Sequence, residues 1–109
     1  MFSFWSRVTE SSPAEAFASR NKDGLLIDVR TPSEFSSGHA EGATSMPLAT
    51  LAESAGALPR DRPIHLICAS GNRSKTAVHI LERAGFRKLA SVRGGTSAWA
   101  STGLPMVRR

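Results

Sequence analysis

Two nearly continuous apolar runs constrain the fold of this 109-residue chain more than any other feature. The first run, GLLIDVR, contains Asp28 near its end, and the second, RPIHLICAS, leads into the only cysteine, Cys68. Short apolar runs without polar alternation are typical of strands that are buried on both faces, as in a parallel sheet covered by helices. Each run is therefore expected to form an inner strand.

The segments around these runs have the patterns of helices and of further strands. Ser12-Pro13-Ala14-Glu15 resembles a capping box with proline at the first helical position, which predicts a helix from Pro13 to about Ser19. Thr31 is a candidate cap for a short helix over 32–37 that Gly38 ends. The remaining expected elements are a brief strand in ATSMPL, a helix in LATLAESAGAL, a helix from the Cys68 turn to Gly85, a strand in RKLASVR and a helix in GGTSAWASTG. This alternation predicts an open parallel α/β sheet with helices on both faces.

Length and composition indicate one globular domain with an anionic ligand or partner. The chain can bury one modest core, its composition is 40% hydrophobic and 21% charged, and it contains no repeat. The net charge of +5 favours anionic partners, but the basic residues are scattered and fit no zinc-finger spacing, so nucleic acid is not expected. Residues 1–7 are too short for a signal-peptide core or a membrane span. We expect them to be an extension that acts as a strand edge, hydrophobic cover or partner-binding patch, followed by a domain over 8–109, with no membrane contact.

The single cysteine lies where a thiolate would be stabilised. Cys68 has no second cysteine with which to form an internal disulfide, so a reducing cytoplasm is the expected compartment. It is expected to end a buried strand and to precede a helix, where backbone N–H groups and the helix dipole favour the thiolate over the thiol. Asp28 also ends a strand, and ligand sites of parallel sheets lie at the carboxyl ends of the strands. Both side chains should therefore meet at one edge.

The residues after Cys68 favour a reactive thiol over a merely buried one. Four residues separate Cys68 from Arg73, whose charge would further stabilise a thiolate. Gly71 permits a positive φ, and Ala69 and Ser70 are small, so that backbone amides could surround a small anion. The alternative is an inert core cysteine, because free cysteines are among the most buried residues. An inert cysteine, however, would need neither the glycine nor the arginine.

Three segments together resemble the rhodanese family. CASGNR matches the six-residue active-site loop of that family, LLIDVRTPSEFSSGHAEGATSMPL its upstream signature, and VRGGTSAWASTGLPM its C-terminal signature. The resemblance extends over about residues 8–106. It implies a single rhodanese-like domain with a five-stranded parallel sheet and helices on both faces.

The resemblance also implies a sulfurtransferase mechanism. Cys68 would take a sulfur from thiosulfate or a related persulfide donor, become a persulfide, and pass the sulfur to cyanide, a thiol or a sulfur-accepting protein. No metal or organic cofactor is implied. The residues implied to bind the persulfide are Ala69, Ser70, Gly71, Asn72, Arg73 and Ser74. Asp28 and Arg30 are expected to brace the loop or its neighbours, and Arg93 either meets an anionic substrate or is a solvated surface residue.

Two other functions stay open on the sequence alone. A cysteine-dependent phosphatase or arsenate reductase would use a similar loop, but that loop has one more residue between cysteine and arginine, and a reductase usually needs a second thiol. A persulfide carrier for a protein partner would need only the loop.

Other conspicuous side chains are expected to be structural. The histidines fit no zinc spacing. We expect a structural hydrogen bond from His39, a position on the opposite strand face from Cys68 for His65, and a solvent-facing His79. Trp99 is expected to anchor the packing, whereas Trp5 has no assigned role.

Overall fold

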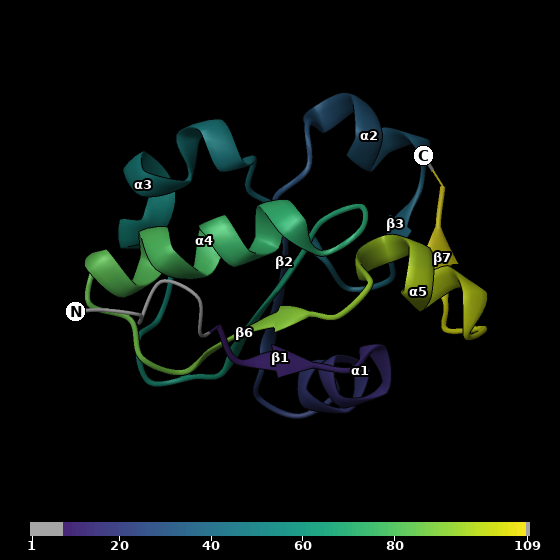
Figure 1. Ribbon diagram of the computed structural model, residues 1–109, viewed down its shortest axis with the longest axis horizontal. Coiled ribbons are helices and arrows are strands. Elements are labelled where there is room, and N and C mark those ends of the chain that lie inside the picture. Colours follow the sequence, from purple (N-terminus) through teal and green to yellow (C-terminus); the bar gives the residue numbers. More distant parts are fainter. Residues whose placement is uncertain (1–7, 109) are drawn as a thin grey trace.

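The computed structural model describes residues 8–108, which form a parallel sheet flanked by helices (Figure 1). The expectations for residues 1–7 and for Trp5 lie outside the described residues. The sheet has five strands in the order β1-β6-β5-β2-β4, and every neighbouring pair is parallel. The strands are β1 (Glu10–Ser11), β2 (Leu25–Asp28), β4 (Thr44–Ser45), β5 (Ile64–Ile67) and β6 (Leu89–Val92). The α/β fold class is as predicted.

Each predicted helical segment contains a helix. The α-helices are α1 (Pro13–Arg20), α2 (Pro32–Ser37), α3 (Leu51–Ser54), α4 (Asn72–Arg83) and α5 (Gly95–Ser101). The segment LATLAESAGAL is not one continuous α-helix, because the 3-10 helices η2 (Leu48–Thr50) and η3 (Ala55–Ala57) flank its single α-helical turn. Tightened turns of this kind are frequent at helix ends. None of the helices within residues 8–108 is long and apolar enough to cross a membrane.

Capping boxes fix the starts of α1 and α2. The Ser12 hydroxyl accepts a hydrogen bond from the Glu15 amide at 3.0 Å, and the Glu15 carboxylate accepts one from the Ser12 amide at 2.7 Å. Thr31 and Glu34 form the same reciprocal pair at 3.2 and 2.9 Å. These bonds satisfy amides that the first helical turn leaves unpaired. The second pair also fixes the position of the Glu34 carboxylate.

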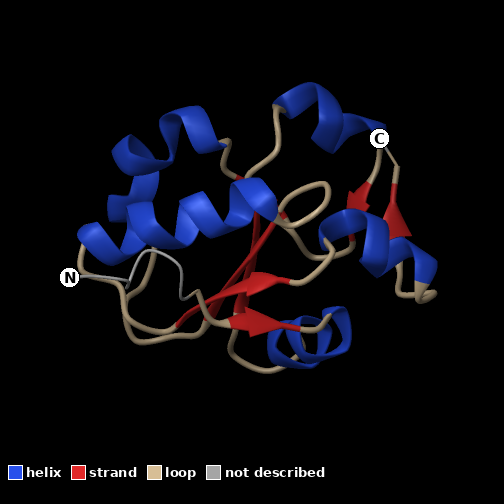
Figure 2. Cartoon of the chain, viewed as in Figure 1, coloured by secondary structure: helices blue, strands red, loops and turns tan. Residues whose placement is uncertain are grey.

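Helices cover both faces of the sheet (Figure 2), and a hydrophobic core lies on each face. One core packs under α3 and α4 and includes Ile27, Leu66 and Leu81. The other packs under α1 and α5 and includes Ile67 and Trp99. Side chains alternate between the faces of a strand, so a strand buried on both faces reads as one apolar run. This is the physical origin of the runs that predicted β2 and β5.

Trp99 anchors the second core, as expected. It is fully buried, and its ring meets that of Phe17 edge-on at a centroid distance of 5.8 Å. Its indole N–H donates to the Pro105 carbonyl at 2.8 Å, so its polar atom is satisfied.

Three short strands had no sequence signal. β1 pairs with β6 at the edge of the sheet, and β3 (His39–Ala40) pairs antiparallel with β7 (Met106–Val107) in a separate two-stranded sheet. Each has two residues. Two residues are too few for apolar alternation, so only their partners define these strands.

The sheet order brings the two predicted strand ends together. β2 and β5 are neighbours, with Asp28 opposite Ile67 in the register, and the Val29 amide donates to the Ile67 carbonyl at 3.0 Å. Cys68 follows directly after Ile67. Asp28 and Cys68 therefore lie side by side at the carboxyl ends of the strands, the edge of the sheet where they were predicted to meet.

Candidate active site

The loop from Cys68 to Arg73 connects β5 to the start of α4. Gly71 caps α4 with φ of 112° and ψ of −5°, a left-handed conformation that glycine adopts without strain. A Cβ at this position would also lie 3.4 Å from the Gly94 amide nitrogen. The sequence correctly indicated that a glycine is required here.

The start of α5 supports the loop from the other side. The Thr96 amide donates to the Cys68 carbonyl at 2.8 Å, and the Ser97 amide donates to the Ala69 carbonyl at 3.1 Å. Gly95 has φ of 59°, and a Cβ there would overlap the Cys68 carbonyl oxygen and the Ala69 backbone. The backbone of α5 therefore packs directly on the loop.

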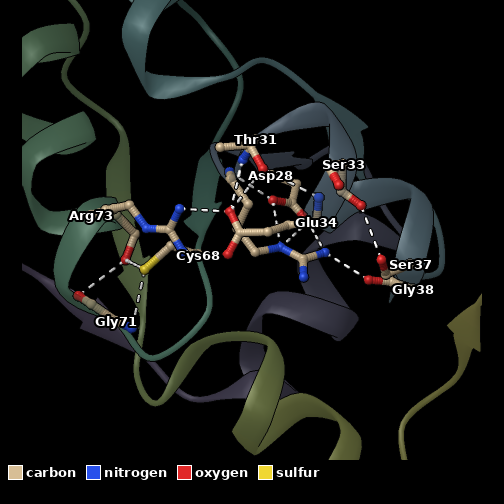
Figure 3. A network of polar contacts seen from close by, with 11 residues as sticks. Asp28, Thr31, Ser33, Glu34, Ser37, Gly38, Cys68, Gly71 and Arg73 are labelled. Carbon is tan, nitrogen blue, oxygen red and sulfur yellow. Dashed lines mark hydrogen bonds and ion pairs between the residues drawn. The ribbon is translucent and has the colours of Figure 1, made fainter.

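The sulfur of Cys68 is enclosed by hydrogen-bond donors. Cys68 is 1% exposed, the Gly71 amide donates to its sulfur at 3.1 Å, and the Ser74 hydroxyl lies 3.5 Å from it (Figure 3). Burial by itself opposes ionisation and is the largest influence on the thiol. Hydrogen bonds from the Ser74 hydroxyl and from the amides of Ser74, Gly71 and Ser70 outweigh it together, and they lower the pKa of Cys68. The loop thus favours a thiolate.

Arg73 has a carboxylate partner that sequence reasoning missed. Its guanidinium binds Glu34 in a bidentate ion pair, with nitrogen–oxygen distances of 2.7 and 2.9 Å (Figure 3). The pair lowers the pKa of Glu34 to about 2, with a further contribution from the Thr31 amide, and raises the pKa of Arg73. The charge of Cys68 also favours the protonated guanidinium, so Arg73 acts on the thiol through the electric field. In the sequence, Glu34 lies three residues after the candidate cap Thr31 and within the upstream family signature, and neither observation indicated an ion pair.

Asp28 and Arg30 bind one another and brace α2. Asp28 is fully buried, and its carboxylate accepts hydrogen bonds of 2.8 to 3.1 Å from the Arg30 guanidinium and one of 2.9 Å from the Arg30 amide. Arg30 also donates to the Gly38 carbonyl at 2.7 Å, at the end of α2. The contacts therefore hold the helix that carries Glu34, and Glu34 holds Arg73.

The side chains of Ser70, Asn72 and Arg93 are not among the described contacts of the Cys68 sulfur. Ser70 and Asn72 are exposed. Arg93 is 59% exposed, and its guanidinium lies 3.3 Å from the Glu10 carboxylate, which also pairs with Lys75 at 3.5 Å. The contacts described for Arg93 thus connect β1 and β6 across the sheet edge and do not include the loop.

Ser91 is a second residue that sequence reasoning missed. It lies on β6, is fully buried, and its hydroxyl is 2.6 Å from that of Ser74. Serine in the middle of RKLASVR reads as an ordinary strand residue, so the sequence carried no signal for this contact.

The histidines have structural contacts. His39 bonds to the Phe35 carbonyl at 2.8 Å and stacks on the Phe35 ring. His65 bonds to the Ser11 hydroxyl at 2.8 Å, and burial lowers its pKa. His79 is partly exposed and lies 3.3 Å from Glu82. In the described part of the chain, no group of three or more His, Cys, Asp or Glu residues could hold a metal ion.

Comparison with known proteins identifies the family. The model of the rhodanese-like domain family matches residues 12–102. The chain belongs to the rhodanese-like family. The family assignment made from the three sequence segments is thus confirmed.

Relatives within the rhodanese-like family include named sulfurtransferases. The chain is 37% identical to a sulfurtransferase of Allochromatium vinosum over 79% of this chain and 80% of that protein. It is 33% identical to the thiosulfate sulfurtransferase GlpE of Pseudomonas entomophila over 84% of each chain.

Solved structures of rhodanese-like proteins share the fold. A rhodanese-related protein from Thermoplasma volcanium has a TM-score of 0.83 and 32% identity, covering 93% of this chain and 99% of its own. A rhodanese-like domain from Anabaena has a TM-score of 0.84 and 29% identity, covering 94% of this chain and 81% of its own.

Proposed function

We propose that this protein is a sulfurtransferase that carries sulfane sulfur as a persulfide on Cys68. The observation that carries the proposal is the set of donors around one enclosed sulfur atom: the Gly71 amide at 3.1 Å and the Ser74 hydroxyl at 3.5 Å, at the start of α4. The names of the relatives support the same reaction class. Covalent catalysis of this kind divides the transfer into two half-reactions.

In the first half-reaction, the Cys68 thiolate attacks the outer sulfur of thiosulfate. A bond forms between Sγ and that sulfur, the sulfur–sulfur bond of thiosulfate breaks, and its electron pair leaves with sulfite. In the second half-reaction, cyanide or a thiolate attacks the terminal sulfur of the persulfide. Cys68 leaves as a thiolate, and thiocyanate or the persulfide of the acceptor is released.

The loop stabilises negative charge both on the Cys68 thiolate and on the Cys68 persulfide. Amides of Ser70, Gly71 and Ser74 favour negative charge on Sγ, and the same fixed dipoles can receive charge on the terminal persulfide sulfur. These dipoles are already ordered by the backbone, so they need little reorganisation during the reaction. Because Cys68 is 1% exposed, the donor has to present a narrow terminal atom such as sulfane sulfur.

The Arg73–Glu34 ion pair favours a second role, as a persulfide carrier. A free arginine would attract thiosulfate, but Glu34 already occupies both terminal nitrogens of Arg73. Attraction for a free dianion is thereby reduced, which suits a protein that receives sulfur from a neutral or weakly charged donor and hands it to one partner. The same pairing is unfavourable to a phosphatase, which would need the arginine for the phosphate.

Intact-protein mass spectrometry after incubation with thiosulfate tests the proposal. We expect a gain of one sulfur atom, its removal by cyanide with formation of thiocyanate, and no gain in Cys68→Ser. If the wild-type protein gains sulfur from neither thiosulfate nor glutathione persulfide, the proposed function is overturned. Loading without appreciable cyanide turnover would favour the carrier role, and hydrolysis of an aryl phosphate would favour the phosphatase.

A further inference from the structure

Two fully buried serines lie in a row behind the thiol, and one of them lies outside the active-site loop. Ser74 is in the first turn of α4, with its hydroxyl 3.5 Å from the Cys68 sulfur. Ser91 lies on β6, and its hydroxyl is 2.6 Å from that of Ser74. A continuous chain of hydrogen bonds therefore runs from the Cys68 sulfur through the Ser74 hydroxyl to the Ser91 hydroxyl.

The number of hydroxyl protons decides the direction of these bonds. Each serine has one proton to donate. The Ser74 oxygen has three neighbours that could accept: the Gly71 carbonyl at 3.2 Å, the Ser91 hydroxyl and the Cys68 sulfur. Within residues 8–108, the Ser91 hydroxyl has a hydrogen bond to Ser74 alone. If Ser74 donated to Ser91, the Ser91 proton would be buried without an acceptor, which is costly. Ser91 is therefore the donor.

We propose that Ser91 is a positioning residue that keeps the Ser74 proton available to the Cys68 sulfur. In the thiol state, the S–H donates to Ser74, and Ser74 donates to the Gly71 carbonyl. When the thiol has lost its proton, the Ser74 hydroxyl turns and donates to the thiolate. In both states the Ser91 proton stays on the Ser74 oxygen, so Ser74 never donates toward β6.

The surroundings make Ser74 the adjustable donor. Among the described residues, the sulfur has hydrogen bonds with backbone amides, whose positions are fixed, and with the Ser74 hydroxyl. The charged groups on neighbouring elements are already paired: Arg73 with Glu34, and Asp28 with Arg30. His65 belongs to the opposite face of β5 and bonds to Ser11. The direction of the Ser74 proton is thus the feature that a buried neighbour can control.

The inference deepens the proposed function and rests on it where sulfur transfer is concerned, but the test needs no sulfur donor. The rate of Cys68 alkylation by iodoacetamide is measured against pH for the wild type and for Ser91→Ala. We expect the midpoint of the profile to move to higher pH in Ser91→Ala and the rate near neutral pH to fall about two- to tenfold, because Ser74 donates more weakly to the thiolate once Ser91 no longer donates to the Ser74 oxygen. Ser101→Ala, an exposed serine on α5, is the control and should match the wild type.

Two comparisons separate positioning from a merely structural effect. In a Ser74→Ala background, Ser91→Ala should cause no further shift, because the Ser74 hydroxyl through which Ser91 acts is absent. Threonine and valine have nearly the same shape, but only threonine has a hydroxyl. Ser91→Thr should therefore preserve the wild-type midpoint, and Ser91→Val should not. An unchanged midpoint in folded Ser91→Ala, an equal shift in the Ser74→Ala background, or equal midpoints for threonine and valine would each overturn the inference. If the midpoint shifts while Cys68 never accepts sulfur, the proposed function fails and the role of Ser91 stands.

Discussion

At the scale of single residues, the charge of Arg73 is already matched inside the protein. Its partner Glu34 has a pKa of about 2, because the Arg73 hydrogen bonds and the Thr31 amide favour the carboxylate. Glu34 therefore stays ionised across the neutral range. A dianionic sulfur donor approaching the loop meets an ion pair, although the sequence shows only an arginine.

Glu34→Gln should strengthen the apparent binding of thiosulfate. Glutamine can preserve the capping box with Thr31 while it removes the negative charge. We expect the KM for thiosulfate to fall about two- to fivefold, equivalent to about 0.4–1 kcal/mol for a partly exposed charge pair. The effect should shrink at high salt because the pair is screened.

Steady-state kinetics with thiosulfate and cyanide give the measurement. Glu53→Gln, at an exposed site on α3, makes the same change in net charge and should leave KM unchanged. A higher KM in Glu34→Gln would mean that the carboxylate serves the donor by ordering Arg73, and the expected effect would then be wrong.

Residue-level prediction from the sequence succeeded where a local pattern was sufficient. The positive φ of Gly71 and the placement of Cys68 before a helix follow from the order of residues in one loop. Glu34 and Ser91 act across the fold, 39 and 17 positions from their partners Arg73 and Ser74. Their own neighbours in the sequence contain no information about these contacts.

At the scale of elements, the position of the loop depends on how closely α5 approaches it. Hydrogen bonds from Thr96 and Ser97 to the carbonyls of Cys68 and Ala69 require near contact between two backbones. Only a residue without a side chain fits at Gly95, because a Cβ would overlap the Cys68 carbonyl oxygen. The paired glycines at the start of α5 thus shape the active-site loop as well as beginning a helix.

Gly95→Ala should destabilise the protein and displace the loop. We expect a loss of about 2–4 kcal/mol in the free energy of unfolding, from a strained positive φ and from the overlap with the loop. Gly103→Ala is the matched control, because Gly103 also has a positive φ, of 82°, but a Cβ there meets nothing within 4 Å. The control should lose only about 1 kcal/mol.

Urea unfolding measures both losses, and Cys68 alkylation reports the loop. The alkylation rate should change in Gly95→Ala and stay at the wild-type value in Gly103→Ala. Equal losses of stability in the two variants would show that the backbone conformation alone is responsible and that contact with the loop contributes little.

Elements with a periodic or continuous apolar signal were predictable, whereas elements defined by a partner were not. β2, β5 and α4 contain enough buried residues to show a pattern. β3 and β7 have two residues each and exist because they pair with one another. Long-range pairing of this kind leaves no trace in a short window of sequence.

At the scale of the whole molecule, a chain of ion pairs and hydrogen bonds connects the sheet to the active-site loop. Asp28 at the end of β2 binds Arg30, Arg30 reaches the end of α2 at Gly38, and Glu34 of α2 binds Arg73. The positions of Asp28 and Cys68 at the ends of two predicted parallel strands were sufficient to predict that they share an edge, because parallel strands end on the same side. The route from one to the other through α2 required the three-dimensional structure.

Removing Arg30 should expose how much the fold depends on this chain of contacts. Arg30→Met leaves the fully buried carboxylate of Asp28 without its counter-charge, and we expect the free energy of unfolding at neutral pH to fall by about 3–5 kcal/mol. In the double variant Asp28→Asn/Arg30→Met the buried charge is absent, so the loss should be smaller by at least about 1 kcal/mol. Urea unfolding of the wild type, both single variants and the double variant gives the coupling between the two residues. Additive losses would contradict the prediction, because they would mean that the two side chains stabilise the protein independently. Cys68 alkylation in the same variants then reports whether the change reaches the thiol. The rate should change in Arg30→Met and in the double variant, because both lose the hydrogen bond to Gly38, and it should change less in Asp28→Asn, which keeps Arg30.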